Sequence, residues 1–273
     1  LKVVSGSLKH RILCGITENA YLSNQCEGNF GHLGYINSVS HDEPVWSVNA
    51  QVQQAFWDDV TGRKLDPALV KQARSEEIEE VYRSNLYTKV PISECYDKAG
   101  KAPISTRWVD INKGDDVNPE FRSRIVGREL KAHDIYRDDL FAATPPLEAK
   151  KMLFSLATTE GIGFSSDSTR PSMKIEFIDI RRAYYQAHAR RELHVQLPPE
   201  DNTPGMCGKL NKALQGTRDA AQCWEYEYNN FMVSELGFVR GICSPCMFYH
   251  PIQNIRAVIH GDDFTLLGTD LSL

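Results

Sequence analysis

Short apolar runs separated by polar turns mark the C-terminal part of the chain. Between residues 256 and 268, two such runs flank the polar tetrad His260-Gly261-Asp262-Asp263. This pattern predicts two short strands joined by a tight Gly-Asp turn, because both residue types are common in turns. The predicted hairpin therefore carries two adjacent carboxylates at its tip.

Apolar residues at helical spacing predict three helices. The first begins at Asp66-Pro67, since Asp is a good helix cap and Pro suits the first helical position. The second follows the Pro pair at 145–146, and the third covers 219–236, with Gly161 and Gly237 as the expected stops. The inward-facing stripes are Val70, Ala73, Ile78, Val81 and Tyr82 in the first helix, Ala149, Met152, Leu153, Leu156 and Ala157 in the second, and Ala221, Trp224, Tyr228, Phe231 and Met232 in the third.

Further strands are expected on both sides of these helices. Residues 103–128 read as two strands around a polar turn, and 175–180 as a buried strand, with another strand at 192–197. From residue 140 onward the order is helix, strand, strand, helix, strand and hairpin. Such a mixture with an antiparallel hairpin favours an α+β fold over a doubly wound parallel sheet.

The composition is that of an ordinary globular protein, with 41% hydrophobic and 25% charged residues among 273. A net charge of only -5 supplies no global basic field, so a nucleic-acid binder would rely on local patches. No apolar run is long enough to span a membrane. The seven cysteines are odd in number and irregularly spaced, which predicts reduced thiols in an intracellular protein.

The paired acids at the hairpin tip are the first candidate for chemistry. Two carboxylates about 4 Å apart repel by about 4 kcal/mol at an effective dielectric of about 20. A divalent cation removes this repulsion, and Mg²⁺ prefers oxygen ligands. Acids in a turn can equally well face water, so a metal site needs a third carboxylate. Asp179 is the candidate, because it ends an apolar segment where an unpaired charge is costly; the alternative is an Asp that caps the next turn.

Eight motifs follow one another between about residues 55 and 270. They are R-W-V at 107–109, F-R-S-R-I-V-G-R at 121–128, F-A-A-T-P-P-L-E at 141–148, D-I-R-R-A-Y at 179–184, L-H-V-Q-L-P at 193–198, K-L with L-Q-G-T-R-D-A and a later W at 209–224, G-F with S-P-C-M-F at 237–248, and H-G-D-D at 260–263. Taken together and in this order, they resemble the reverse transcriptase domain of copia-type LTR retrotransposon Pol polyproteins.

The resemblance implies a right-hand polymerase fold of the α+β class, with an antiparallel palm sheet backed by helices. We expect fingers at 55–137 and 187–221 and palm at 138–186 and 222–273, with the last part incomplete and the thumb missing. Residues 1–54 form an N-terminal segment of unknown role.

The resemblance also implies RNA-directed DNA polymerase activity on an RNA or DNA template with a primer. The attack of the primer 3′-hydroxyl on a dNTP would use two Mg²⁺ ions, with Mn²⁺ as an alternative. Asp179 and Asp262 are the expected bridging ligands of both ions, and Asp263 is a supporting ligand. This makes the three acids the predicted catalytic and metal-binding residues.

Five further residues are expected to bind the dNTP. Tyr184 stands where related polymerases have a steric gate that excludes a 2′-hydroxyl, although a core tyrosine is the simpler alternative. Arg122 and Arg124 occupy alternate strand positions and could face one triphosphate, or they form a solvated strand face. Gln215 and Gly216 are expected near the 3′ side of the nucleotide, where Gly permits close backbone approach.

The chain departs from the family pattern at His260-Gly261, which replace an aromatic and a small aliphatic residue. Few residues follow the acid pair, so we expect a chain truncated before the thumb and RNase H, with little processive activity by itself. The expected partners are template–primer, dNTP and the rest of the Pol polyprotein (thumb, RNase H, integrase), with no membrane. The expected location is intracellular, in cytoplasmic particles with a possible nuclear phase.

Two other functions compete with the polymerase. One is an inactive, truncated transposon relic that keeps the motifs without catalysis. The other is a nucleic-acid-binding module that reuses the palm sheet. The acidic charge balance and the lack of a stripe of base-stacking aromatic residues argue against the module.

Overall fold

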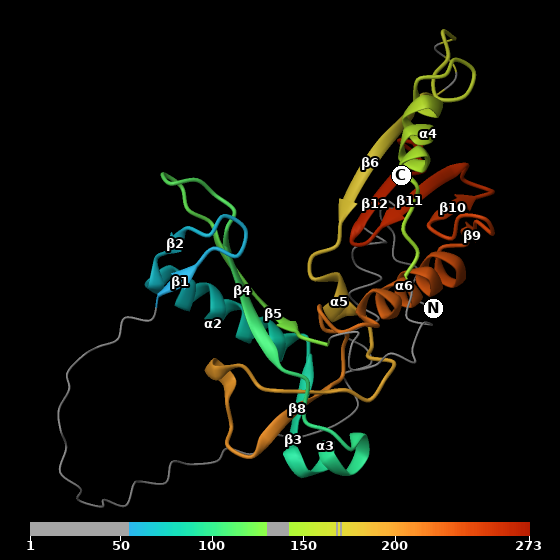
Figure 1. The fold of residues 1–273 in the computed structure, drawn as a ribbon. Coiled ribbons are helices and arrows are strands. Elements are labelled where there is room, and N and C mark those ends of the chain that lie inside the picture. Colours follow the sequence, from blue (N-terminus) through green and yellow to red (C-terminus); the bar gives the residue numbers. More distant parts are fainter. Residues whose placement is uncertain (1–54, 130–141, 168, 170) are drawn as a thin grey trace, which may run out of the picture.

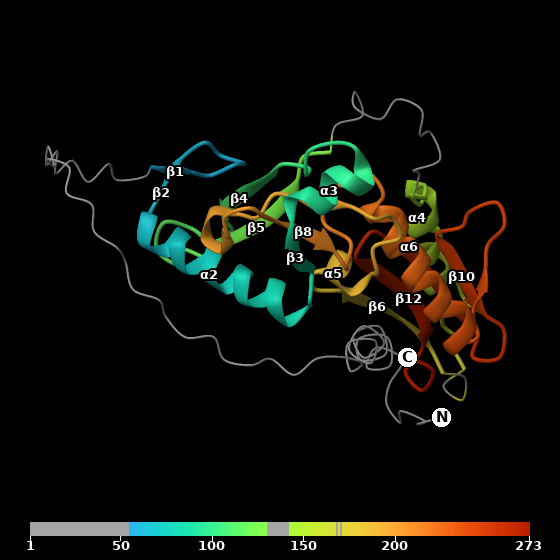
Figure 2. The same ribbon diagram turned by 90° about the horizontal axis from the view of Figure 1, so that it is seen from below.

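A computed structural model describes residues 55–129, 142–167, 169 and 171–273 of the chain. Within them, helices combine with one five-stranded, one three-stranded and two two-stranded sheets, and all pairings between named strands are antiparallel. The predicted α+β class is confirmed. In both views, the five-stranded sheet lies at one end of the molecule and helix α2 (Pro67–Arg83) lies at the other (Figures 1 and 2).

The five-stranded sheet has the order β6-β12-β11-β10-β9. Its central strands, β11 and β12, are the predicted hairpin, joined by the turn Gly261-Asp262. Strand β6 pairs with β12 although about 80 residues separate them in the chain, so the fold brings residue 179 beside the hairpin. The strands are β6 Met173–Asp179, β9 Val239–Arg240, β10 Met247–His250, β11 Ile255–His260 and β12 Asp263–Thr269.

Helices cover both faces of this sheet. Val258 and Leu267 pack against Ala149 and Leu153 of helix α4 (Leu147–Ala157). On the other face, Phe264 and its neighbours pack against helix α6 (Ala220–Asn230) and the π-helical turn η3 (Phe231–Glu235). Because successive side chains of a strand point to opposite faces, two covered faces require a continuous apolar strand. This explains why β11 and β12 read as unbroken apolar runs.

The other end of the molecule is built on α2 and the hairpin β4–β5 (Thr106–Asn112 and Phe121–Gly127), both as predicted. Asp66 caps α2 by accepting hydrogen bonds from the amides of Ala68 and Leu69, at 2.8 and 3.1 Å. Helix α2 packs against β5, and β1 (Phe56–Trp57) pairs with β2 (Lys64–Leu65) beside β4.

There is also a three-stranded sheet of order β3-β8-β7, and the sequence pattern predicted only one of its strands. Helix α3 (Ile92–Ala99) follows β3 directly after Pro91 and ends at Gly100, whose φ of 63° suits a glycine C-cap. The remaining elements are β3 Tyr87–Pro91, β7 His194–Val195, β8 Met206–Leu210, α5 Ala183–Gln186 and the 3₁₀ turn η2 Pro199–Asp201.

Several predicted details are wrong. Strand β6 is not fully buried, because it forms an edge of its sheet and leaves Phe177 60% exposed. Tyr82 points outward from α2, where its hydroxyl donates to Asp201 instead of packing. Met152 and Ala221 are also exposed, because their helices turn the adjacent Leu153 and Ala220 inward.

Helix ends and one strand also differ from prediction. Helix α4 ends at Ala157, four residues before Gly161, and α6 changes to the π-helical turn before Gly237. Strand β7 is only two residues long, and Gln196 donates instead to the carbonyl of Ile104. The described cysteines are free, whereas Cys14 and Cys26, like the motif residue at 141, lie outside the described residues. No helix in the described ranges has the length and apolarity needed to cross a bilayer.

Candidate active site

Three carboxylates converge where β6 meets the hairpin tip. Asp179, the last residue of β6, stands directly opposite Asp263, the first residue of β12. Asp262 lies in the turn between the hairpin strands, and its carbonyl accepts a hydrogen bond of 3.0 Å from the amide of Ile180. One carboxylate oxygen of each Asp lies within 4.8 Å of the other two, and all three residues are exposed. The structure thus brings together the three acids that the sequence analysis singled out.

The turn is fixed in place by its backbone and by a tryptophan. Gly261 has a φ of 64°, the sign that a type II′ hairpin turn needs at its first central position. Its carbonyl accepts a hydrogen bond of 2.7 Å from Nε1 of Trp224. Trp224 itself is buried and makes an edge-on contact with Phe264 of β12. The hairpin tip is therefore tied to helix α6, which holds the Asp pair at a defined position beside β6.

The charge of this carboxylate cluster is not neutralised by ion pairs within the described residues. Among the described residues, no Lys, Arg or His forms an ion pair with Asp179, Asp262 or Asp263. Exposed like charges about 4 Å apart repel by about 1 kcal/mol in water and by more in a less polar setting. A divalent cation relieves this repulsion, and three carboxylates supply the oxygen ligands that Mg²⁺ takes. The side chains present therefore fit a divalent-cation site.

A pocket of about 220 Å³ opens beside the cluster. Its lining includes Asp262 together with Arg124 from β5, Tyr184 from α5 and Gln215 from the loop before α6. Four predicted site residues from separate parts of the chain thus line one cavity. This arrangement places a cation, an aromatic ring and an amide next to the carboxylates.

Tyr184 packs between the apolar cores of the two ends of the molecule. It is half-buried, and this burial raises the pKa of its hydroxyl, with a further contribution from the charge of Asp262. Its neighbour Tyr185 is buried, and its hydroxyl donates a hydrogen bond of 2.8 Å to Glu77 of α2. Of the two adjacent tyrosines, only Tyr184 has the charge of an active-site Asp near its hydroxyl, although both line the pocket.

The two predicted β5 arginines have different positions. Arg124 lines the pocket, whereas Arg122 does not, although both are partly buried. Burial, then the positive charge of Arg124, lowers the pKa of Arg122. The two guanidinium groups are close enough to interact, which fits one anion bound by both.

Gly216 is needed for a contact within the protein. Its φ is 87°, and a Cβ at this position would lie 2.1 Å from the carbonyl oxygen of Gly127. The amide of Gly127 in turn donates to the carbonyl of Gln215 at 2.7 Å. The close backbone approach expected at Gly216 is thus an approach to the end of β5, and it positions Gln215 at the pocket.

The sequence analysis missed the ionic connection behind the pocket. Arg182 has a left-handed backbone (φ 53°) and forms ion pairs with Glu77 at 2.7 Å and Glu80 at 3.1 Å. Glu77 is buried on α2, so these bonds hold the segment around Tyr184 against that helix. The sequence did contain a signal for this connection, because Glu77 is a charged residue on the inward-facing side of α2.

Two nearby arginines, Arg190 and Arg191, also make internal contacts. Arg191 pairs with Glu129 and Asp219 at 2.9 and 2.7 Å, and Arg190 stacks on Tyr226. Arg191 therefore connects parts of the protein through ion pairs, whereas Arg190 is exposed and contacts the protein by its stacking on Tyr226.

Comparison with known proteins gives a consistent result for most of the chain. Residues 95–273 match the family model described as reverse transcriptase (RNA-dependent DNA polymerase). A "Retrovirus-related Pol polyprotein from transposon TNT 1-94" of Nicotiana tabacum is 24% identical over 212 residues, which are 74% of this chain and 15% of that protein. A "Retrovirus-related Pol polyprotein from transposon RE1" of Arabidopsis thaliana is 25% identical over 119 residues, 41% of this chain and 8% of the relative. The chain therefore matches only a small part of each polyprotein.

Proposed function

The chain belongs to the reverse transcriptase (RNA-dependent DNA polymerase) family, which confirms the resemblance to copia-type retrotransposon Pol polyproteins, and from this premise we propose that it is the RNA-directed DNA polymerase domain of such a polyprotein. It would extend a primer 3′-hydroxyl with dNTPs on an RNA or DNA template. The proposed partners are template–primer and the thumb, RNase H and integrase parts of the polyprotein. The proposed location is a cytoplasmic particle with a nuclear phase.

The elements suit a palm and fingers division. We assign the palm to the five-stranded sheet with α4 and α6, within 138–186 and 222–273. The fingers would comprise α2, the β4–β5 hairpin and the three-stranded sheet, within 55–137 and 187–221. The chain leaves and re-enters each part, as expected for subdomains that are discontinuous in sequence.

The convergence of Asp179, Asp262 and Asp263 is the observation that carries the proposal. The three carboxylates would hold Mg²⁺ or Mn²⁺, with Asp179 and Asp262 as bridging ligands and Asp263 in support. When bound, two such ions lower the pKa of an attacking hydroxyl and neutralise the charge on phosphate oxygens. The contribution of the protein is to hold three acids together without ion pairs to them within the described residues, so that their carboxylates are available to the ions.

The pocket residues would bind the dNTP. Arg124, with Arg122 behind it, would pair with phosphate oxygens, because guanidinium groups match the geometry of phosphate. The ring of Tyr184 would lie beneath the sugar and clash with a 2′-hydroxyl. Gln215 would contact the nucleotide on its 3′ side, supported by the Gly216 turn.

A transposon relic without catalysis is the second candidate, and His260 favours it. His260 is exposed at the end of β11, opposite Asp263, where the family has an aromatic residue that packs near the primer end. A smaller and titratable ring at this position weakens that packing. The retained carboxylates argue that metal binding survives.

A single-nucleotide incorporation assay on a primed RNA template tests the proposal. We expect the chain to add one complementary dNMP in Mg²⁺ or Mn²⁺, and Asp262→Asn to abolish this. Asp270→Asn is the matched control, because Asp270 is an exposed acid after β12 whose partner is Lys174 and not the cluster. Equal rates in the two variants would contradict the assigned role of the hairpin acids.

Mn²⁺ binding separates the two candidates if no incorporation is seen. Mn²⁺ that binds to the wild type but not to Asp262→Asn, without nucleotide addition, would support the relic. Failure of the folded wild-type chain to bind Mn²⁺ or a dNTP would refute both the metal site and the polymerase assignment.

A further inference from the structure

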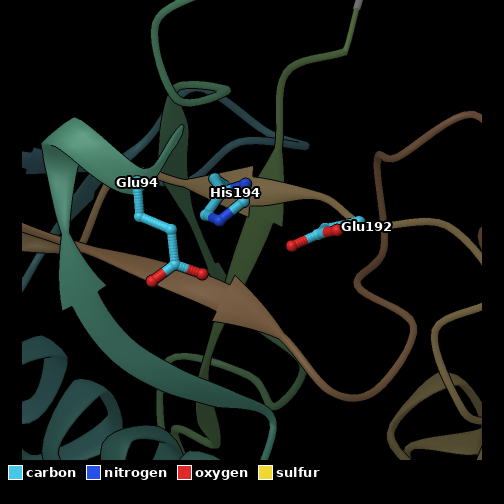
Figure 3. Close-up of side chains that lie close together, drawn as sticks. All are labelled: Glu94, Glu192 and His194. Atoms are coloured by element: carbon cyan, nitrogen blue, oxygen red, sulfur yellow. The ribbon is translucent and has the colours of Figure 1, made fainter. Parts of the chain in front are cut away.

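A second group of metal-ligating side chains lies in the three-stranded sheet. Glu94 belongs to the first turn of α3, His194 to strand β7, and Glu192 to the loop just before β7. One potential ligand atom of each residue lies within 4.8 Å of the other two. Figure 3 shows the Glu192 carboxylate pointing toward the His194 ring, with the carboxylate of Glu94 on the other side of that ring. His194 is part of the L-H-V-Q-L-P motif, but none of the three residues belongs to the predicted polymerase site.

The histidine of this group is buried without a hydrogen-bond partner. His194 is only 3% exposed, and neither Nδ1 nor Nε2 makes a hydrogen bond within the described part of the chain. A buried polar group left unpaired costs about 1–3 kcal/mol, so such groups are rare in folded proteins. Burial also lowers the pKa of His194, which favours the neutral imidazole that metal ions bind. This imidazole, which lies beside two carboxylates and has no hydrogen-bond partner of its own among the described residues, indicates a place for a ligand.

Two lysines form ion pairs with the carboxylates of this cluster. Lys98 lies 2.8 Å from both Glu94 and Glu192, and Lys209 lies 3.0 Å from Glu192 and 3.8 Å from Glu94. Both lysine side chains are partly exposed, at 44% and 34%. Exposed ion pairs of this kind are worth little, so the lysines can swing into water when a stronger cation arrives. The lysines account for the charge of the acids but leave the imidazole unpaired.

We infer that Glu94, Glu192 and His194 form a binding site for a first-row divalent metal ion such as Zn²⁺, with water as the fourth ligand. An imidazole with carboxylates suits Zn²⁺ or Co²⁺, whereas the all-carboxylate cluster at the hairpin suits Mg²⁺. Two glutamates balance the charge of the ion once the lysines have left. The ion would connect α3 with the strand β7.

Small side-chain movements are enough to close the site. Ligands at 2.0–2.2 Å in a tetrahedral site lie about 3.4 Å from one another. From separations of up to 4.8 Å, the groups must approach by at most about 1.4 Å. Glu94 and Glu192 are 29% and 44% exposed at the side chain, so both can move while the buried His194 stays fixed.

Zn²⁺ binding by the full chain tests this site. The titration is made by calorimetry in excess Mg²⁺, which occupies the all-carboxylate cluster. We expect one Zn²⁺ per chain, at least 10-fold weaker binding in Glu192→Gln, and at least 3-fold tighter binding in Lys98→Ala, because the competing cation is gone. Glu148→Gln, an exposed acid in the first turn of α4, is the matched control and should bind Zn²⁺ as the wild type does.

Direct observation of the imidazole completes the test. In the wild type, the ¹⁵N signals of His194 should shift when one equivalent of Zn²⁺ is added. His194→Ala should lose the Zn²⁺ site, but this buried substitution can disturb folding, so Glu192→Gln decides the result. No Zn²⁺ binding by the folded wild type, equal affinity in Glu192→Gln and Glu148→Gln, or unshifted His194 signals would overturn the inference.

Discussion

Asp179, Asp262 and Asp263 lie as close together as Glu94, Glu192 and His194, yet within the described residues only the second group forms ion pairs with cationic side chains. The hairpin acids form no ion pair within the described residues, whereas two lysines cross-link the glutamates. Neighbouring lysines would compete with a catalytic cation. Under the proposed function, the hairpin acids would be free to take cations, whereas the acids of the sheet cluster are already paired with lysines.

The largest expected difference between the two clusters is in catalysis. Asp179→Asn should reduce nucleotide incorporation by at least about 100-fold, because it removes a ligand of the proposed ions that stabilise the reacting phosphate. Glu94→Gln should stay within about 3-fold of the wild type. Single-turnover incorporation on a primed template measures both rates. A large loss in Glu94→Gln, or none in Asp179→Asn, would remove the functional distinction between the clusters.

Sugar selection tests the pocket that opens beside the hairpin acids. Tyr184→Ala should lower the preference for a dNTP over the matching rNTP by at least about 10-fold, because the ring that would clash with the 2′-hydroxyl is gone. Tyr184→Phe keeps the ring and should keep the preference. The ratio of kcat/KM for the two nucleotides is the measurement, with circular dichroism to verify folding. The same ratio in Tyr184→Ala and the wild type would assign Tyr184 to the core alone.

Stability without metal should respond in opposite directions at the two clusters. In EDTA, Asp179→Asn should be more stable than the wild type by about 1 kcal/mol, since it removes repulsion between exposed acids. This corresponds to a Tm increase of about 2–4 °C. Glu192→Gln should lower Tm, because it breaks two ion pairs. Mg²⁺ should then stabilise the wild type but not Asp179→Asn. A lower Tm for Asp179→Asn in EDTA would show that the three acids are compensated after all.

The two clusters were not equally visible in the sequence. The hairpin could be predicted because its signals are local: two apolar runs and a Gly-Asp turn. Helix α2 was equally clear, since Asp66 caps it and Pro67 starts it. The third carboxylate, Asp179, could be proposed because an unpaired charge at the end of an apolar strand is energetically unfavourable. These features depend on neighbours in sequence, which a pattern can record.

The sheet cluster depends on contacts that no local pattern records. Strand β7 has two residues, and His194 stands opposite Lys209 only because β7 pairs with β8. Glu94 reaches them from a helix of eight residues, too short for a clear periodicity. Similarly, Gly216 was recognised as a close-approach glycine, but its partner Gly127 could be found only in the folded chain. Register and long-range packing therefore account for what the sequence pattern left out.

Asp58 is a third case, a carboxylate whose charge is stabilised by backbone amides instead of a metal ion or lysines. The effect expected here is the smallest of those predicted. The Asp58 carboxylate accepts hydrogen bonds from the amides of Asn112, Thr61 and Val60, at 2.7 to 2.9 Å, and these bonds lower its pKa to about 2. A folded-state pKa below the unfolded value of about 3.9 means that the stabilisation is complete above pH 4 and is lost as the pH falls toward 2. The free energy of unfolding of the wild type, relative to Asp58→Asn, should therefore drop by about 1–2 kcal/mol between pH 5 and pH 2. Denaturant titrations at both pH values measure this difference, in which acids common to the two proteins cancel. A pH-independent difference would mean that the amides do not hold the Asp58 charge, and that a carboxylate here needs no partner beyond water.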